Sequence, residues 1–233
     1  MDQKKKYCYE YPRPALTTDC VIFGFDGVEL NVLLIERGIE PYKGKWALPG
    51  GFVRMDENTE DSALRELKEE TGVENVFIEQ LYTFSDVDRD PRGRVVSVAY
   101  FALVRSTDYE VIGGDDASSA RWFRLSDIPS LAFDHDMVIR VAQKRLKGKI
   151  RYQPVGFELL DEHFTIPELQ RLYECILETK FDRRNFYKKI MKTGLLTALD
   201  KKEPRVSHKA ARYFMFDKKK YQELVASGFN FEI

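Results

Sequence analysis

The chain has 233 residues, more than the roughly 100–150 of a typical single domain, so we expect one domain plus a smaller second one. Its 43% hydrophobic and 13% aromatic residues are enough for a packed core and argue against disorder, and its three cysteines form no C-x-x-C pair that would indicate a disulfide framework or a thiolate metal site. No apolar run approaches the roughly 18 residues that span a bilayer, so we expect a soluble cytoplasmic protein without membrane association.

The net charge of −1 hides an uneven distribution along the chain. From Lys180 to Lys220 there are 14 basic and four acidic residues, a balance of +10, which leaves −11 for the rest. Such asymmetry favours a basic C-terminal surface for a polyanion such as nucleic acid. On charge alone, a solvated lysine-rich face explains the pattern equally well.

Strand patterns dominate the N-terminal part. Residues 19–25 and 30–35 are β-branched and aromatic runs on either side of an Asp-Gly turn, which predicts a hairpin. A helix is predicted at residues 59–71, because Gly72 supplies a stop signal, and further strands at residues 76–84, 94–104 and 120–123. This order predicts an α+β fold with a mixed β-sheet and packed helices.

From residue 134 the pattern of the sequence becomes helical. Apolar residues at spacings of one, three and four predict a helix at residues 134–147, and residues 148–154 are interpreted as a connection. We therefore predict two domains, residues 1–150 and residues 151–233.

Within the second domain, Thr165 and Glu168 form a capping box with Pro167 in the first turn, a strong helix start. A short break at residues 179–181 leads to Asp182, a good N-cap, and to a second helix that ends near Lys192. Strand-like runs at residues 195–199 and 213–216 then flank a basic loop. Helix, tight turn, helix and hairpin in this order predict a winged helix-turn-helix domain.

An acidic cluster on the first helix carries the strongest chemical signal. Glu69 and Glu70 follow Glu66 by three and four residues, so their carboxylates share one helix face. Hard oxygen ligands converging in this way suit Mg²⁺ or Mn²⁺, although three glutamates alone also fit a solvated acidic helix. Glu57 is placed to join the cluster, Arg65 to hold the carboxylates, and Gly51 to let the backbone approach closely.

The complete spacing, G-x5-E-x7-R-E-U-x-E-E-x-G-U from Gly51 to Val73, resembles the Nudix box. In Nudix enzymes this motif holds a metal that bridges a diphosphate and activates water. The resemblance implies a metal site at Gly51, Glu66, Glu69 and Glu70, and catalytic roles for these three glutamates together with Glu57 and Arg65.

The flanking segments narrow the resemblance. Residues 43–53, 90–100 and 131–135 look like the ADP-ribose-type Nudix branch, and residues 157–160, 164–170, 173–174 and 182–186 resemble the winged-helix half of the Nudix-related transcriptional regulators (NrtR type). This implies a homodimeric regulator whose Nudix domain binds an effector and whose winged helix binds a double-stranded DNA operator. The implied effector is ADP-ribose or a related nucleotide, or a catabolic sugar such as the pentose arabinose.

Two sets of candidate binding residues follow. The candidates for the effector are Arg37, Trp46, Phe52, Arg92, Arg94 and His135. Core packing is the alternative for the two aromatic side chains, surface ion pairs for the arginines, and a helix cap for the histidine. The candidates for DNA are Arg183, Arg184, Asn185, Lys188, Lys189, Lys192, Lys201, Lys202 and Arg205.

The sequence leaves the function open between three classes. The first is a ligand-responsive DNA-binding regulator, favoured by the basic segment. The second is a Mg²⁺-dependent Nudix diphosphate hydrolase acting on ADP-ribose or a related nucleoside diphosphate derivative, favoured by the complete box. The third is a protein-interaction module without DNA binding, since winged helices do not all bind DNA.

Overall fold

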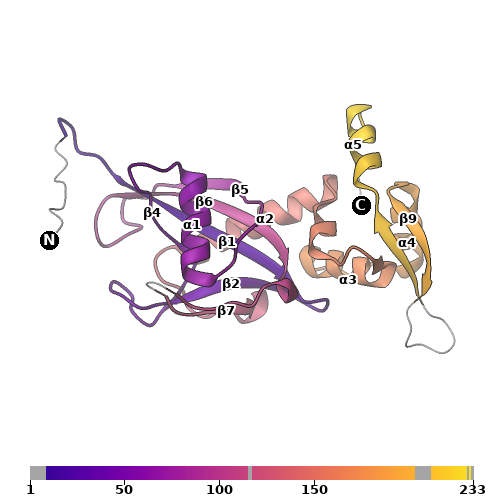
Figure 1. Ribbon diagram of the computed structural model, residues 1–233, viewed down its shortest axis with the longest axis horizontal. Helices are drawn as coiled ribbons and strands as arrows, with labels where there is room; N and C mark the ends of the chain where they lie inside the picture. The colour runs from indigo at the N-terminus through magenta and orange to yellow at the C-terminus, as the bar shows by residue number, and fades with distance from the viewer. Residues whose placement is uncertain (1–8, 115–116, 203–210, 230, 232–233) are drawn as a thin grey trace.

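The computed structural model describes residues 9–114, 117–202, 211–229 and 231, with only the backbone at residues 201 and 202. The N-terminal part is built on a seven-stranded mixed sheet in which five strands follow the order β3-β2-β1-β6-β5, while β4 pairs with β1 and β7 with β2 (Figure 1). The strands are β1 (Ala15–Phe25), β2 (Leu30–Arg37), β3 (Trp46–Ala47), β4 (Gly50–Phe52), β5 (Glu79–Phe84), β6 (Val95–Arg105) and β7 (Ala117–Arg124).

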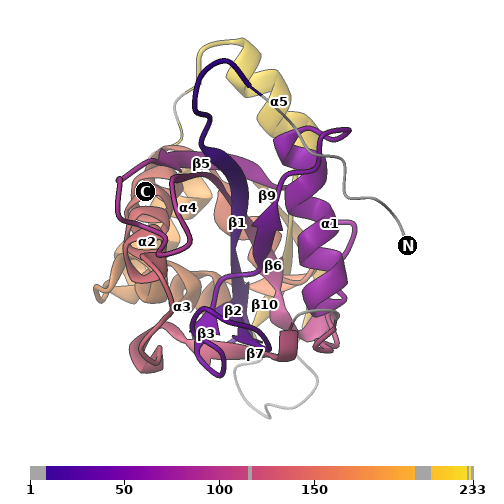
Figure 2. The ribbon, with the colours of Figure 1, turned by 90° about the vertical axis from the view of Figure 1, so that its left-hand side faces the viewer.

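The predicted hairpin is present as β1 and β2, which are antiparallel, whereas β1 and β6 run parallel along their full lengths. Alternate residues of β1 bury against opposite layers. Cys20 and Ile22 pack with Leu67 of helix α1 (Thr59–Thr71), whereas Val21 and Phe23 pack with Val138 of helix α2 (His135–Tyr152). The sheet therefore lies between these two helices, as Figure 2 shows.

Helix α1 has the predicted bounds. Asn58 caps its first turn by accepting a hydrogen bond from the Asp61 amide, and Gly72 ends it in the left-handed conformation. The Thr59 and Tyr100 hydroxyls are 2.7 Å apart and join the helix start to β6. The acidic face of the helix is thus fixed over one end of the sheet.

Helix α2 is longer than predicted. Residues 148–152 are helical, so the interpretation of this segment as a connection was wrong. Val138, Ala142, Leu146 and Ile150 repeat every fourth residue and are all buried, so packing of Ile150 outweighs the weak helix propensity of Gly148. The helix runs from one end of the sheet to the C-terminal part of the chain.

The C-terminal part contains the predicted helix, turn, helix and hairpin. Its helices are α3 (Ile166–Leu177) and α4 (Arg183–Lys192), and its three-stranded sheet has the order β8-β10-β9, with β8 (Phe164–Thr165), β9 (Leu196–Lys202) and β10 (Arg212–Phe216). A further helix, α5 (Lys218–Ala226), follows β10 and was not predicted. The 3-10 helices are η1 (Ser106–Asp108), η2 (Leu125–Asp127) and η3 (Val155–Leu159). Among the described residues, no helix is both long and apolar enough to cross a membrane.

Candidate functional site

Arg65 lies at the centre of the acidic cluster on α1. Its Nη1 donates hydrogen bonds to Glu66 Oε1 at 2.6 Å and to Glu69 Oε2 at 2.9 Å, while Nε and Nη2 both donate to Glu57 at 2.9 and 2.7 Å. One guanidinium thus holds three carboxylates, as a planar group with five N–H donors can. The hydrogen bonds that Arg65 donates lower the pKa of Glu57 to about 2, and the acceptance of these bonds by Glu57, Glu66 and Glu69 raises the pKa of Arg65.

Glu70 is held differently from the other carboxylates. It is buried, and its Oε2 accepts a hydrogen bond from the Gly50 amide at 2.8 Å. Gly51 packs directly on Glu66, since a Cβ at Gly51 would lie 2.4 Å from Glu66 Oε1. The predicted close approach of this glycine to the acidic helix is therefore present. Burial raises the pKa of Glu66, against the opposing effect of Arg65.

The acidic helix faces a pocket of about 390 Å³. The pocket is lined by β1, β2, β4, α1, the loop between β5 and β6, and the start of α2; its polar and aromatic lining includes Thr17, Asp19, Arg37, Phe52, Arg54, Arg65, Glu66, Glu69, Glu70, Arg89, Asp90, Arg92, Phe133 and His135. Four of the six predicted effector residues, Arg37, Phe52, Arg92 and His135, are among them. The pocket thus combines carboxylates on one wall with arginines and aromatic rings on another.

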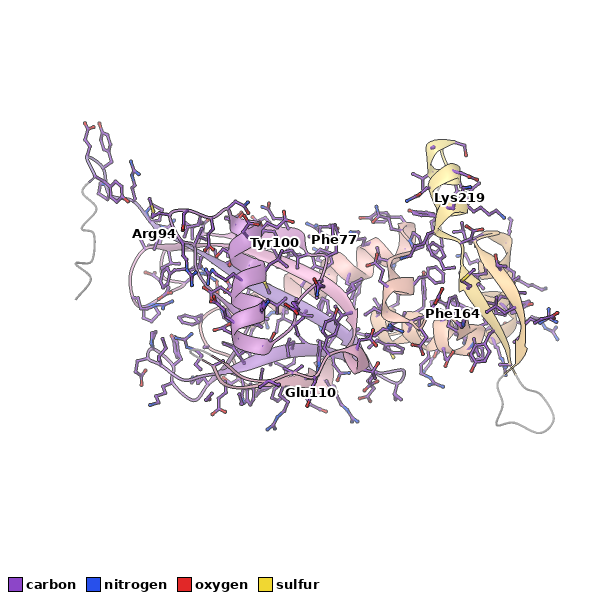
Figure 3. The ribbon with its side chains drawn as sticks, in the orientation of Figure 1. Phe77, Arg94, Tyr100, Glu110, Phe164 and Lys219 are labelled. Carbon is purple, nitrogen blue, oxygen red and sulfur yellow. The ribbon has the colours of Figure 1, made fainter. Side chains whose placement is uncertain are left out.

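The other two predicted effector residues are not part of the lining. Trp46 packs edge-to-face on Phe123, with ring centroids 4.6 Å apart, and this is the core role that the sequence left as its alternative. Arg94 donates to the Asp86 carbonyl oxygen at 3.3 Å and lies at the end of the sheet far from the winged helix (Figure 3).

Two arginines that line the pocket lie over aromatic rings that also line it. The Arg92 guanidinium lies 4.7 Å from the ring centre of Phe52 and 5.3 Å from that of Phe133, and the Arg37 guanidinium lies 4.9 Å from Phe133. Arg92 also pairs with Asp90 at 2.7 Å. Burial alone would raise the pKa of Asp90, but the hydrogen bonds from Arg92 lower it. Flat rings and fixed cations together suit a ligand that has both a planar group and negative charge.

A buried ionic network forms the floor of the pocket. The Asp19 carboxylate accepts a hydrogen bond from Ser97 Oγ at 2.5 Å and lies 3.3 Å from Arg89 Nη2 and 3.5 Å from His135 Nε2. Burial would raise the pKa of Asp19, but His135, Arg89 and Ser97 together lower it to about 2. Arg89 also donates to Asp134, the N-cap residue of α2, at 2.7 Å.

His135 joins this network to the backbone. Its Nδ1 accepts a hydrogen bond from the Leu48 amide at 2.8 Å, so the side chain is buried and ordered at the helix start. Asp19 and Arg89 were not predicted as site residues. The signal for Asp19 was a single charged residue in a strand of otherwise uncharged residues, but nothing in the local sequence of Arg89 indicates its partners.

The glutamates of α1 are the candidate ligands for a metal ion. Within the described ranges, no group of three or more His, Cys, Asp or Glu side chains is already gathered as a metal site. Glu66, Glu69 and Glu70 nevertheless all line the pocket, and hard oxygen donors open to water and ligand are what Mg²⁺ and Mn²⁺ take. Because Arg65 and Gly50 hold these side chains in place, the donor set fits such an ion.

A second candidate site lies on the winged helix. Asp182 caps α4 by accepting a hydrogen bond from the Asn185 amide at 2.9 Å, and Phe186 and Ile190 anchor the helix in the core. The predicted DNA-binding residues Arg183, Arg184, Asn185, Lys188, Lys189 and Lys192 are all exposed. Lys201 and Lys202 lie at the end of β9, where only the backbone is described, and Arg205 lies outside the described residues.

A groove of about 770 Å³ runs beside this basic helix. It is lined by residues of α3 and α4 and by strands β9 and β10, including Gln170, Arg183, Arg184, Tyr187 and Arg212. Tyr187, which the sequence did not single out, is 47% exposed on α4. Amide groups at helix starts and clustered arginines are typical of surfaces that bind phosphate.

Two family models match the chain: that of the NUDIX domain over residues 13–142, and that of the NrtR DNA-binding winged helix domain over residues 156–216. The "ADPR responsive transcriptional repressor NtrR" of Acinetobacter baylyi is 36% identical over 195 residues, which cover 82% of this chain and 78% of that protein. An ADP-ribose pyrophosphatase of Methanocaldococcus jannaschii is 42% identical over 136 residues, 58% of this chain and 76% of that enzyme. Among solved structures, Shewanella oneidensis NrtR complexed with a 27mer DNA superimposes with a TM-score of 0.73 at 33% identity, covering 93% of this chain and 97% of that one.

Proposed function

Because this chain belongs to the Nudix family and carries a winged-helix domain of the NrtR type, we propose that it is a transcriptional repressor that binds operator DNA and responds to ADP-ribose. One observation carries the proposal. A single chain holds a pocket with carboxylates, arginines and aromatic rings in one part, and an exposed basic helix beside a groove in the other. The A. baylyi relative, which is similar over both parts, is an ADPR-responsive repressor.

The proposed division is an effector-binding Nudix domain at residues 1–150 and a DNA-binding domain at residues 151–233. The two family models, which end at residue 142 and begin at residue 156, support this division. We also propose a homodimer, because one winged helix reads only a few base pairs and paired half-sites about one helical turn apart give a longer operator.

The lining of the pocket favours ADP-ribose over a free pentose. ADP-ribose has a diphosphate and an adenine ring, whereas a pentose such as arabinose has neither. Arg37 and Arg92 supply cations for the phosphates, and Phe52 and Phe133 supply faces on which a base or sugar can pack. A neutral sugar would leave these groups unused.

The carboxylates of Glu66, Glu69 and Glu70, beside the backbone of Gly51, are the groups that would hold Mg²⁺ or Mn²⁺. When bound, such an ion offsets the charge of the diphosphate and, in a hydrolase, activates water. Arg65 acts as a positioning residue, since it fixes Glu66 and Glu69 and ties Glu57 to them.

The same site gives the second candidate function, hydrolysis of ADP-ribose. The observation that favours it is the complete box, with Glu57, Glu66, Glu69 and Glu70 present as proposed catalytic residues and Arg65 present to position them, together with the similarity to the M. jannaschii enzyme. The two functions are compatible, because an effector can be consumed by the domain that senses it. The rate at which the protein hydrolyses ADP-ribose decides which of the two functions is the main one.

Fluorescence anisotropy with labelled DNA tests the proposal. Fragments from upstream of the protein's own gene and of its neighbours are titrated at several salt concentrations against random DNA of equal length. About 6–10 phosphate contacts would weaken binding by about 10³–10⁵ between 50 and 200 mM salt. If no fragment binds better than random DNA, or if a chain without residues 153–233 binds equally well, the repressor proposal fails.

A thermal-shift panel of ADP-ribose, NAD and pentoses, each with Mg²⁺, identifies the effector. A ligand at 100 times its dissociation constant stabilises the folded protein by about 2.7 kcal/mol. A shift with arabinose and none with ADP-ribose would overturn the assignment of the pocket.

A further inference from the structure

The β1–β2 hairpin connects the effector pocket with the winged helix. At one end of the hairpin, Thr17 and Asp19 of β1 and Ile35 and Arg37 of β2 line the pocket. The turn at residues 26–29 lies at the other end, about 25 Å away by the rise of a strand, and reaches α3 (Figure 1). The two strands thus cross the Nudix sheet from the effector pocket to the proposed DNA-binding domain.

Side-chain hydrogen bonds hold the turn of this hairpin. Asp26 Oδ1 accepts hydrogen bonds from the amides of Val28 and Glu29 at 2.8 and 2.7 Å, and Asn31 Nδ2 donates to Asp26 Oδ2. The hydrogen bonds that it receives lower the pKa of Asp26, against the opposing effect of burial. A turn fixed in this way moves with its strands as one body.

Two side chains of α3 hold the turn. Arg171 Nη1 donates to the Gly27 carbonyl oxygen at 2.8 Å, and Cys175 Sγ donates to the Val28 carbonyl oxygen at 3.3 Å. These residues are four apart and therefore lie on one face of the helix. Both hydrogen bonds are accepted by backbone oxygens, so they depend on the position of the hairpin and not on the identity of its side chains.

Two neighbouring residues on α3, Gln170 and Glu174, hold the turn that leads into α4. Gln170 Nε2 donates to the Phe181 carbonyl oxygen at 3.0 Å and to Glu174 Oε1 at 2.9 Å, and Glu174 Oε1 also accepts from the Phe181 amide. Residue 181 directly precedes Asp182, the N-cap of α4. A shift of α3 therefore carries the turn between the helices with it, and with that turn the orientation of Arg183 and Arg184.

We propose that the β1–β2 hairpin transmits occupancy of the pocket to α4, with Arg171 and Cys175 as the contacts that receive it. The proposal rests on the proposed function, since it needs both an effector and an operator. A ligand that engages β1 and β2 moves the turn against α3 and so changes the fit of α4 to DNA. Arg171 is a positioning residue in this account, because it touches neither ligand.

The test measures the factor by which saturating ADP-ribose with Mg²⁺ changes the dissociation constant for operator DNA. In the wild type we expect a factor within the usual allosteric range of about 5–150. Arg171→Ala should reduce it at least threefold while leaving the affinity for ADP-ribose alone unchanged, and Arg171→Lys should restore part of it. The control is Arg151→Ala, an exposed arginine in the last turn of α2, which should leave the factor unchanged.

The outcomes separate the two proposals. If the wild type binds operator but ADP-ribose has no effect, the proposed function fails. If ADP-ribose acts on Arg171→Ala as on the wild type, the signal does not depend on the contact of the hairpin with α3 and the hairpin proposal is overturned.

A second measurement needs no variant. Amide hydrogen exchange of the wild type with and without ADP-ribose should change at residues 26–29 and 179–182 together. Exchange that changes only around the pocket would also overturn the proposal.

Discussion

Replacement of Arg65 tests the geometry of the acidic site, because Arg65→Gln removes the one cation that three carboxylates share. The Arg65 side chain is 17% exposed, and those of Glu57, Glu66 and Glu69 are 12%, 14% and 34% exposed. Removal of one partner from a fully buried pair costs about 3–5 kcal/mol, so this half-buried cluster should lose about 2–3 kcal/mol of unfolding free energy. For a chain of this size that lowers Tm by about 4–12 °C.

Arg54→Gln is the matched control. Arg54 pairs with the same cluster, 3.6 Å from Glu69 Oε1, but it is 58% exposed, so its loss should cost less than about 1 kcal/mol. Urea unfolding of both variants and the wild type at pH 7 gives the comparison. Equal losses in the two variants would refute the central role of Arg65.

The pH dependence of this loss separates charge from packing. The folded-state pKa of Glu57 is about 2, below its ordinary value of 4.5, so the stability that Glu57 contributes is present above pH 4.5 and is lost as pH falls towards 2. The difference between wild type and Arg65→Gln should therefore shrink across this range. A difference that stays constant would mean that Arg65 acts through its packing alone.

Four further predictions concern the two sites. Asp19→Asn should remove part of the stability that the wild type loses between about pH 4 and pH 2, because the pKa of Asp19 is about 2; unfolding with urea across this range checks it, and an unchanged pH profile would contradict it. Glu69→Gln should weaken binding of Mg²⁺ or Mn²⁺ in calorimetry, and unchanged metal affinity would refute the proposed metal site. Turnover of ADP-ribose should fall far below the common enzyme range of about 1–1000 per second, whereas tens per second would put hydrolysis first. Arg184→Ala or Asn185→Ala should cost about 1–3 kcal/mol of DNA binding and relax sequence preference, whereas Lys202→Ala should weaken binding evenly across sequences, and anisotropy titrations with matched and mutated operators distinguish the two patterns.

Local signals were sufficient for much of the fold. The Asp-Gly turn gave the β1–β2 hairpin, Gly72 ended α1, and the Thr165 capping box began α3, because each depends on residues close in sequence. The acidic face of α1 and the exposed basic face of α4 followed from helical periodicity. In both helices, the charged side chains and the spacing that brings them to one face belong to a single helix.

Contacts between distant residues could not be predicted in the same way. Asp19 and Arg89 are 70 residues apart, and Arg89 and Asp134 are 45 apart, so their network depends on how the loop between β5 and β6 packs on α2. Trp46 was placed in the effector site because aromatic side chains near the box suit a ligand, yet it packs on Phe123 of β7. Helix α5 was missed although its N-cap residue, Asp217, accepts a hydrogen bond from the Lys220 amide, because a helix of nine residues with none of them buried leaves only a short apolar pattern in the sequence.

The central claim is that ADP-ribose and operator DNA bind to one chain and influence each other, and a linkage measurement tests it most directly. The DNA affinity is measured with and without ADP-ribose and Mg²⁺, and the ADP-ribose affinity with and without operator. Coupling between two sites is reciprocal, so both ratios should equal the same factor, expected at about 5–150. Ratios of one in both directions, with each ligand bound, would contradict the account.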